Sequence, residues 1–527
     1  MFTSLTFIGF ISFVAIYTYL RLREEKLDSS EGYFLGGRSL TGIVIAGSML
    51  LTNISTEHLI GMNGSSYRNG LIIIAWEVTS AIALVAAAIY FVPRYLKMGL
   101  TTIPEFLEKR FDRTTRLIVA FFLIVSFVIT LLPIVLYTGA INLESIFNVS
   151  EVLGVSQSEG LWITVVIIGV IGSIYAIFGG LKAVAISDTI NGYGLLVGGL
   201  AIPILALIAI GENSFFNGLN RVYENNPEKF NVIGAKNSVL PFEVLFTGLI
   251  INQLYFWAMN QTIIQRALGA KNLIEAQKGL LYTGGLKILV PLIIAFPGII
   301  GFYYFGDSFY ENQDMIYPEL IKKVLPPALV GIFAAIIMGA VLSTFNSVLN
   351  SAATIFSMDI YKGYFYKNAS EKQLVKVGKY LSALLAIFAI FVAPMVANAP
   401  EGLYQLLQQL NGIYFIPVAS ILIAGFFIKQ ISALGAKVSL IVGLGFYILM
   451  TFILKTDIHF VHIWGIEFLL NIGTMLIISR FYPYDGSFSF NTLKIDDMKQ
   501  WKYTKVMSYS LCFITVLIYI VLGNSSV

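Results

Sequence analysis

The chain has 527 residues, of which 57% are hydrophobic and only 12% are charged. Soluble proteins carry about 25% charged residues, so the composition excludes a soluble protein and indicates a polytopic membrane protein. The net charge of +4 is small, and the single cysteine, Cys512, excludes an intramolecular disulfide or a cysteine metal cluster. The three histidines, His58, His459 and His462, are too scattered for a histidine-rich metal centre.

Fourteen apolar segments follow one another along the chain, and a spanning helix needs about 20 such residues. No Lys or Arg precedes the first segment, whereas Arg21, Arg23 and Lys26 follow it. A signal peptide has the opposite arrangement, so we expect an uncleaved helix with its N-terminus outside. The segments are 5–20, 41–62, 70–95, 117–147, 160–180, 186–211, 240–263, 277–304, 327–358, 378–397, 402–427, 434–454, 460–479 and 506–523.

The basic residues between these segments are unevenly distributed. Numbered from an external N-terminus, the internal loops hold 26 Lys and Arg residues and the external loops hold 7, while Lys287 falls inside a segment. Short loops rich in Lys and Arg stay on the cytoplasmic side of a membrane. The distribution therefore supports fourteen spans, with both termini external, in a plasma membrane or a bacterial inner membrane.

Polar residues interrupt the second apolar segment at 51–58, which reads LTNISTEH. Polar groups at membrane depth are costly, so they normally face a protein interior or a water-filled cavity. They also favour a helix that breaks inside the membrane, where freed backbone groups can bind an ion or a substrate. The alternative is a re-entrant loop or a snorkelling helix end.

Further polar residues lie inside the later segments, and each has a structural alternative. Glu77 and Lys287 can form a buried ion pair, Ser, Thr and Asn can pack helices together, aromatic rings can be plain core, and Asp188 can cap a helix. As a set, however, these residue types resemble a carbohydrate site, in which polar groups bind the hydroxyls and a ring covers the sugar. The set is Glu77, Ser80, Asp188, Asn252, Gln253, Tyr255, Trp257, Asn260, Gln261, Lys287, Ser343, Thr344, Asn346, Ser347, Asn350, Ser351, Gln408, Gln409 and Asn411.

Four short strings carry a family resemblance: NISTEH at 53–58, IQR at 264–266, EAQKG at 275–279 and NSAATIFSMDIY at 350–361. They resemble the sodium/solute symporters, and among these the sodium/galactose and sodium/glucose cotransporters most closely. The resemblance implies an all-α polytopic membrane protein with a LeuT-like fold of two inverted five-helix repeats. The implied divisions are 1–40 for an extra N-terminal helix and loop, 41–211 and 240–427 for the repeats, and 428–527 for three C-terminal helices.

The resemblance also implies a sugar site, carried over position by position. Its members would be Asn53, His58, Glu77, Ser80, Gln253, Trp257, Lys287 and Gln408, with Tyr137 as a further contact. The hydrophobic outer gate would be Met62, Trp76 and Tyr404. The inner gate is a tyrosine in close relatives but is Phe256 here, so a ring can still cover the sugar while the hydrogen bond of the hydroxyl is lost.

By the same resemblance, one sodium ion would bind the backbone carbonyls of Leu51, Ile54 and Ala340 and the hydroxyls of Ser343 and Thr344. Neutral oxygens near an unwound helix suit a monovalent cation. Two further residues match a second sodium site of some relatives. They are Asp188 and Ser347, but Asn346 replaces a hydroxyl residue there, so the stoichiometry stays open.

The sequence therefore predicts a symporter in which Na⁺ entry drives the uptake of a hexose, glucose or galactose, by alternating access. Another small solute, such as myo-inositol, sialate or an amino acid, is the alternative, although neutralisation of Lys287 by Glu77 favours an uncharged polyol. Two alternatives from other functional classes are a membrane enzyme and a transporter-like sensor. No P-loop, His-Glu-x-x-His motif or cytosolic signalling domain supports them, and we expect no enzyme activity and no nucleic-acid partner.

Overall fold

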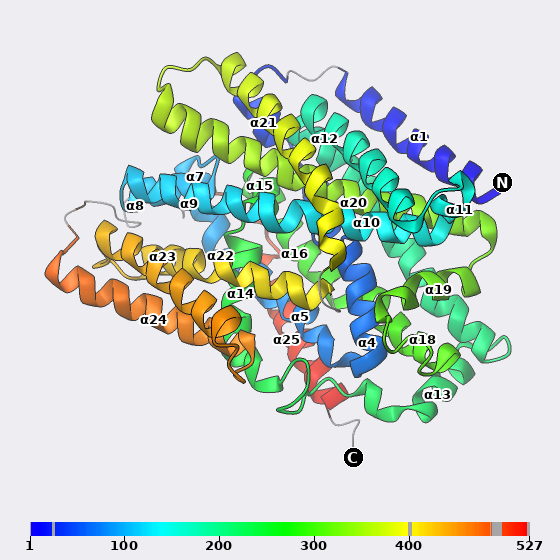
Figure 1. The fold of residues 1–527 in the computed structure, drawn as a ribbon. Helices are drawn as coiled ribbons and strands as arrows, with labels where there is room; N and C mark the ends of the chain where they lie inside the picture. Colours follow the sequence, from blue (N-terminus) through cyan, green and yellow to red (C-terminus); the bar gives the residue numbers. More distant parts are fainter. Residues whose placement is uncertain (1, 24–26, 399–402, 485, 487–497, 524–527) are drawn as a thin grey trace.

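The computed structural model describes residues 2–23, 27–398, 403–484, 486 and 498–523. This part of the chain is a bundle of helices (Figure 1), and its one β contact is an isolated bridge between Leu40 and Ala270. The helices of the first half are α1 (Phe2–Leu22), α2 (Ser30–Leu35), α3 (Gly42–Asn53), α4 (Asn63–Asn69), α5 (Ala75–Val78), α6 (Ser80–Ala86), α7 (Val92–Met98), α8 (Ile103–Arg110), α9 (Arg113–Ser126), α10 (Leu132–Phe147), α11 (Val149–Leu153) and α12 (Gln157–Ile210).

The second half continues with longer helices and several short, bent ones. They are α13 (Phe215–Asn225), α14 (Gly248–Ala258), α15 (Gln261–Leu268), α16 (Leu273–Leu289), α17 (Pro291–Ile294), α18 (Phe296–Phe305), α19 (Ile316–Val324), α20 (Pro327–Ile355), α21 (Glu371–Val392), α22 (Leu403–Phe427), α23 (Ala433–Ile448), α24 (Phe460–Phe481) and α25 (Thr504–Gly523). Three π-helical stretches matter below: η2 (Glu57–Met62), η9 (Phe356–Phe365) and η11 (Leu449–Ile453).

Ten helical stretches of the described residues are long and apolar enough to cross a membrane. Helix α16 and the α17–α18 pair, bent by 41° relative to each other, would make eleven if counted as one span. The expected count of fourteen is therefore not confirmed. The difference arises because predicted segments are fused in one place and split in two others.

Segments 160–180 and 186–211 are counted together because both lie in α12, which consists of two helices joined at a kink where Gly180 has non-helical φ and ψ. Its φ of +57° is a conformation that glycine adopts without strain. A Cβ atom there would also lie 2.5 Å from the carbonyl oxygen of Tyr33. Glycine thus permits both the bend and the close approach of α2.

The split segments are 41–62 and 240–263. In the first, α3 ends at Asn53, Ile54 has a non-helical ψ of 84°, and η2 resumes the helix at Glu57. The predicted helix break in this segment is confirmed. In the second, two residues separate the end of α14 from the start of α15. The side chain of the second of these, Asn260, caps the N-terminus of α15.

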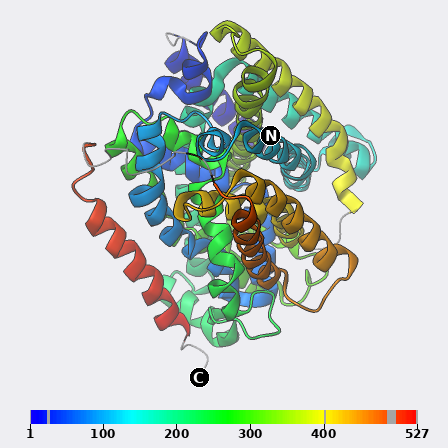
Figure 2. The ribbon, with the colours of Figure 1, turned by 90° about the vertical axis from the view of Figure 1, so that its left-hand side faces the viewer.

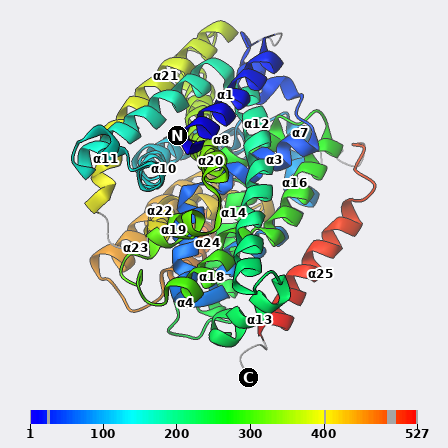
Figure 3. The same ribbon diagram turned by 90° about the vertical axis from the view of Figure 1, so that its right-hand side faces the viewer.

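The α12 element lies at the centre of many helix contacts and packs against α20, α3, α10 and α1. On another side, α22, α23 and α24 pack together and α24 also contacts α14. Helix α25 lies along the edge of the molecule against α6 and α16, where Figures 2 and 3 show it in red. The two broken segments are thereby enclosed by continuous helices.

Each end of the described chain contacts a segment near a connection between two other helices. The Thr3 hydroxyl donates a hydrogen bond of 3.1 Å to the carbonyl of Pro327, at the start of α20. At the other end, Gly523 packs on Ile233, in the connection between α13 and α14. Helix α18 contacts both α13 and α19, the helix that precedes α20.

Candidate functional site

A cavity of about 60 Å³ lies beside the break between α3 and η2. Because the helix is interrupted here, polar side chains and backbone groups can face a space that a continuous apolar helix would fill. Residues from both broken segments and from α5, α16, α20 and α22 line this space, which we call the central cavity. They are Thr52, Asn53, Glu57, His58, Trp76, Glu77, Leu131, Asn252, Gln253, Phe256, Trp257, Asn260, Thr262, Ile263, Lys287, Thr344, Val348, Tyr404, Leu407, Gln408, Asn411 and Phe415.

Lys287 makes the strongest polar contacts in the central cavity. Its ammonium group donates to the Asn53 amide oxygen at 2.5 Å and forms an ion pair with Glu77. The Nζ atom also lies 5.3 Å from the centre of the Trp257 ring, within cation–π range. Since the ammonium and the carboxylate are both buried, each requires the other as a partner.

His58 stands between two carboxylates. Its Nδ1 is 3.6 Å from Glu57 Oε1 and its Nε2 is 3.9 Å from Glu77 Oε1. The imidazole lies edge-on to Tyr404 with ring centres 5.1 Å apart, and Nδ1 is buried without a hydrogen-bond partner. A ring nitrogen in this state can donate to, or accept from, a hydroxyl group in the cavity.

Two amide side chains fix the aromatic walls. Gln253 donates to the Trp76 carbonyl at 2.7 Å, while its own oxygen accepts the indole N–H of Trp257 at 3.1 Å. Gln408 donates to the Tyr404 hydroxyl at 2.8 Å. The cavity therefore combines oriented amides, a charged pair and two indole rings, a set suited to a solute with several hydroxyl groups and an apolar face.

The structure brings most of the predicted sugar-binding residues to this cavity and leaves two outside it. Ser80 instead donates its hydroxyl to the Glu77 carbonyl. Tyr137 lines a different cavity, of about 670 Å³, together with Glu144 and Ser145. The residues that meet at the central cavity are Asn53, His58, Glu77, Gln253, Trp257, Lys287 and Gln408.

Three of the four predicted gate residues, Trp76, Phe256 and Tyr404, line the central cavity. The rings of Trp76 and Tyr404 meet edge-on with centres 6.1 Å apart. Met62 is fully buried and does not belong to the lining. Phe256 sits beside Trp257, one residue before it on α14, with ring centres 5.2 Å apart.

Six polar residues that also line this cavity are not members of the sugar site, the gates or the sodium site that the resemblance implies. They are Thr52, Glu57 and Thr262, together with Asn252, Asn260 and Asn411, which belong only to the wider polar set of the sequence. Asn411 follows Gln408 by three positions, a spacing that puts both on one helix face and could have identified it. Glu57 directly precedes His58, a member of the implied sugar site, and its carboxylate accepts a hydrogen bond from Ser55. With Glu57 included, two carboxylates and one lysine face the solute space.

The helix break also releases backbone carbonyls. In a continuous helix the amide of Ser55 would donate to the carbonyl of Leu51, but here it donates to Asn53 at 3.1 Å. The ψ of 84° at Ile54 turns the following carbonyl out of the helix direction. Oxygens near this break are therefore available to a cation.

Hydroxyl groups of α20 face the same break. Thr344 donates to the Thr52 carbonyl at 2.9 Å, and the Ser343 and Thr52 hydroxyl oxygens are 3.4 Å apart. Ala340, three positions before Ser343, is buried on this helix. The structure thus places the hydroxyl members of the predicted sodium site next to the released carbonyls.

The two residues predicted for a second sodium site, Asp188 and Ser347, both contact Arg266. The guanidinium is 3.8 Å from Asp188 and hydrogen-bonds to Ser347, and Ser48 donates to Asp188 at 2.7 Å. The count of basic residues predicts Arg266 in an internal loop, and this prediction is wrong, because Arg266 is fully buried in α15. Its partners on α3, α12 and α20 supply the charge and hydrogen bonds that a buried guanidinium needs.

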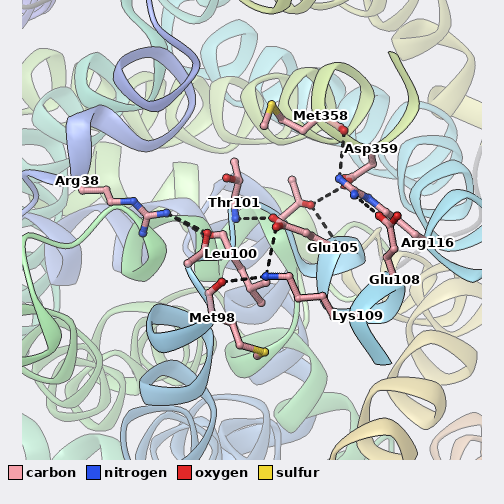
Figure 4. A network of polar contacts seen from close by, with 12 residues as sticks. Arg38, Met98, Leu100, Thr101, Glu105, Glu108, Lys109, Arg116, Met358 and Asp359 are labelled. Atoms are coloured by element: carbon pink, nitrogen blue, oxygen red, sulfur yellow. Dashed lines mark hydrogen bonds and ion pairs between the residues drawn. The ribbon is translucent and has the colours of Figure 1, made fainter. Parts of the chain in front are cut away.

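A second polar network lies outside the central cavity, where α8 and α9 meet η9 (Figure 4). Arg116 Nη2 is 2.5 Å from the carboxylate of Asp359, and the Thr102 hydroxyl donates to the same carboxylate at 2.8 Å. Arg116 also pairs with Glu108. Asp359 lies in the string at 350–361 that carries part of the family resemblance. None of the residues of this network lines the central cavity.

Residues 33–443 match the model of a protein family described as "Sodium:solute symporter family". The chain is 45% identical over 515 residues to an uncharacterized symporter, YidK, of Escherichia coli, covering 98% of this chain and 90% of that protein. It is 33% identical over 453 residues to the sodium/glucose cotransporter of Vibrio parahaemolyticus, covering 82% and 81%.

Among solved structures, a substrate-bound, outward-open Na⁺-coupled sialic acid symporter matches with a TM-score of 0.77. The alignment covers 91% of this chain and 98% of the other at 20% identity, so it bears on the fold alone. The all-α, LeuT-like fold is confirmed. The match to a family of transporters likewise confirms that the chain is not an enzyme and that Na⁺ is its coupling ion. This multi-pass membrane protein belongs to the sodium:solute symporter family.

Proposed function

We propose that this symporter carries a hexose, glucose or galactose, into the cell together with Na⁺. The observation that best supports the proposal is the meeting of the Glu77–Lys287 pair, the Gln253 and Gln408 amides and the Trp257 ring in one cavity. Carboxylate and amide oxygens accept, and ammonium and amide N–H groups donate, so hydroxyls find both kinds of partner. The similarity to a sodium/glucose cotransporter supports the same substrate class.

The charges of the cavity favour a neutral solute over an anionic one. Lys287 is already paired with Glu77, and Glu57 adds a second carboxylate to the lining. An anion such as sialate would meet no unpaired lysine or arginine among these residues. Like charges brought together in a desolvated site repel strongly. An uncharged polyol avoids this cost.

For sodium, we propose the carbonyl oxygens of Leu51, Ile54 and Ala340 and the hydroxyls of Ser343 and Thr344 as ligands. The released carbonyls and the facing hydroxyls of α20 support this choice. An ion there would tie the break of α3 to α20. Because Asn53 and His58 flank the break, sodium binding would order the solute site, and sodium release would loosen it.

A second ion at Asp188 and Ser347 is the alternative to a single-ion cycle. Arg266 brings a fixed positive charge to within 3.8 Å of Asp188. A sodium ion at the same carboxylate would have to share it with this guanidinium, which opposes binding. The contact therefore favours one sodium ion per solute.

We further propose that both termini are external and that 41–211 and 240–427 are inverted repeats. The excess of basic residues in the alternate loops supports the orientation. A membrane potential of about 100 mV supplies about 2.3 kcal/mol per charge. One sodium ion could then sustain a gradient of roughly fifty-fold for a neutral sugar.

Uptake into proteoliposomes tests the proposal. Purified protein would be assayed with glucose, galactose, myo-inositol, sialate and a neutral amino acid, each with an inward Na⁺ gradient and with K⁺ in its place. We expect Na⁺-dependent uptake of a hexose that is stimulated by an inside-negative potential. Preferential uptake of myo-inositol, sialate or the amino acid would replace the hexose, and uptake that ignores Na⁺ would remove the proposed sodium site.

A further inference from the structure

Helix α24 carries a carboxyl group deep inside the protein. Glu467 is the eighth of its 22 residues, so it lies about 10 Å from the start of this membrane-spanning helix. Its exposure is 0%, and neither carboxyl oxygen accepts a hydrogen bond of good geometry. The polar side chain that approaches this carboxyl group, Asn471, is neutral, and its amide donates to Ser420 at 3.2 Å.

The helices packed against α24 offer this carboxyl group no cation. They are α14, α22 and α23, followed by η11, and α5 touches α24 through the Trp76 and Trp464 rings. The charged residue of α5, Glu77, is an acid and is paired with Lys287. Neither α14 nor α22 nor η11 contains a charged residue. Lys437, the one charged residue of α23, lies 2.7 Å from Asp112 and is occupied there. Tyr447 of α23 interacts electrostatically with Glu467, and its hydroxyl donates to the Gln409 carbonyl at 2.9 Å.

Helix α24 itself provides no partner either. His462 lies five residues before Glu467, and its Nδ1 is 3.0 Å from the Thr247 hydroxyl. Arg480 lies thirteen residues after Glu467, about 20 Å along the helix, and is exposed. Among the described residues no ion pair reaches Glu467, in contrast to Glu77 and Asp359.

An ionised carboxylate without a partner is costly to bury, and such a group takes up a proton instead. A proton needs no set of ligands, whereas a metal ion would require several oxygens around it. We propose that Glu467 is a proton-binding site and that its carboxyl group is protonated in the transport-competent protein. In this proposal the proton stays on the Glu467 carboxyl group and stabilises the folded protein. It is not transported across the membrane.

The site is linked to the wall of the central cavity. Trp464, one turn before Glu467, meets Trp76 with ring centres 6.1 Å apart, and Trp76 lines the cavity. A Cβ atom on Gly412 would lie 2.1 Å from the indole nitrogen of Trp464, so α22 and α24 are in direct contact. Ionisation of Glu467 would require water between these helices, and the support of Trp76 would be lost. Deprotonation is therefore expected to lower solute uptake.

Infrared spectroscopy of the full-length protein tests the protonation directly. During a titration from neutral to alkaline pH, wild type should lose a carbonyl-stretching band of a protonated carboxylic acid, and Glu467→Gln should lack that band. The matched control is Glu212→Gln, which removes an exposed carboxylate that pairs with Arg221 at 2.9 Å and should leave the band in place. A band that persists in Glu467→Gln, or none in wild type, overturns the proposal.

Thermal stability across the same pH range gives a second readout that does not depend on the solute. Wild type should lose melting temperature at alkaline pH, whereas Glu467→Gln and the apolar variant Glu467→Leu should not. Solute uptake should follow the same pattern wherever it is measurable. If Glu467→Gln instead raises the Na⁺ concentration needed to stabilise the protein, the carboxylate binds sodium and the proton site is refuted. Failure of hexose uptake alone leaves both readouts intact and counts against the proposed substrate.

Discussion

Two buried ion pairs occupy different regions of this protein. Glu77 and Lys287 are 210 positions apart in the chain, and Arg116 and Asp359 are 243 apart. Both pairs join distant helices, and in both the carboxylate is almost completely buried. The first faces the central cavity beside Asn53, whereas the second joins α8 and α9 to η9 outside that cavity. The two pairs thus share the same chemistry but differ in their position relative to the cavity, and this difference predicts different roles.

The largest effect is expected from removing one partner of the outer pair. Arg116→Ala leaves Asp359 buried without its cation, which should cost about 3–5 kcal/mol of stability, nearer the lower value because Arg116 is 12% exposed. Melting temperature in detergent measures this loss. The folded fraction should bind solute with wild-type affinity. Weaker solute binding by a stably folded Arg116→Ala variant would contradict the prediction that only the cavity pair affects solute binding.

The corresponding change in the cavity should act on solute binding. Glu77→Gln keeps the shape and an acceptor for Lys287 but removes the charge, so we expect folded protein whose solute affinity falls by about 1.5–3 kcal/mol. Equilibrium binding of radiolabelled sugar measures the change. Asp359→Asn is the matched control and should retain solute affinity. Wild-type affinity in Glu77→Gln would remove this carboxylate from the site.

His58 sharpens the comparison because it touches the cavity pair without belonging to it. We expect His58→Gln to keep transport, since an amide can donate and accept as a neutral imidazole does. His58→Leu should lose about 1–3 kcal/mol of solute affinity through an unmade buried hydrogen bond. Sodium binding without solute should change little in either variant. If the Leu variant binds solute normally, His58 serves packing alone.

The smallest effect is expected where no charged side chain is involved. Replacing Ser343 and Thr344 together by Ala should raise the Na⁺ concentration for half-maximal uptake at least about tenfold, or about 1.4 kcal/mol. Thr354→Ala removes another hydroxyl of α20, one that donates to the Asn350 carbonyl, and should leave sodium dependence unchanged. Normal sodium dependence in the double variant would disprove the proposed ligands.

Local features of the sequence determined the membrane class, the broken segment and most members of the cavity. Apolar length is a property of consecutive residues, and the cost of polar groups in a bilayer makes 51–58 conspicuous without any knowledge of its neighbours. The family strings then identified Lys287, Glu77 and Gln408 as members of one site, and the structure brings these three to one cavity.

Other features were decided by tertiary packing. Tyr137 faces a different cavity, Met62 is sealed in the core, and Arg266 lies buried against Asp188 instead of in a loop. Hydropathy locates a segment along the chain but not the rotation of its helix or the neighbours it meets. Glu467 is the clearest case, because its residue type suggests a charge. Only the packing of the helices shows that Lys437, on a neighbouring helix, pairs with Asp112 and that no cation among the described residues pairs with Glu467.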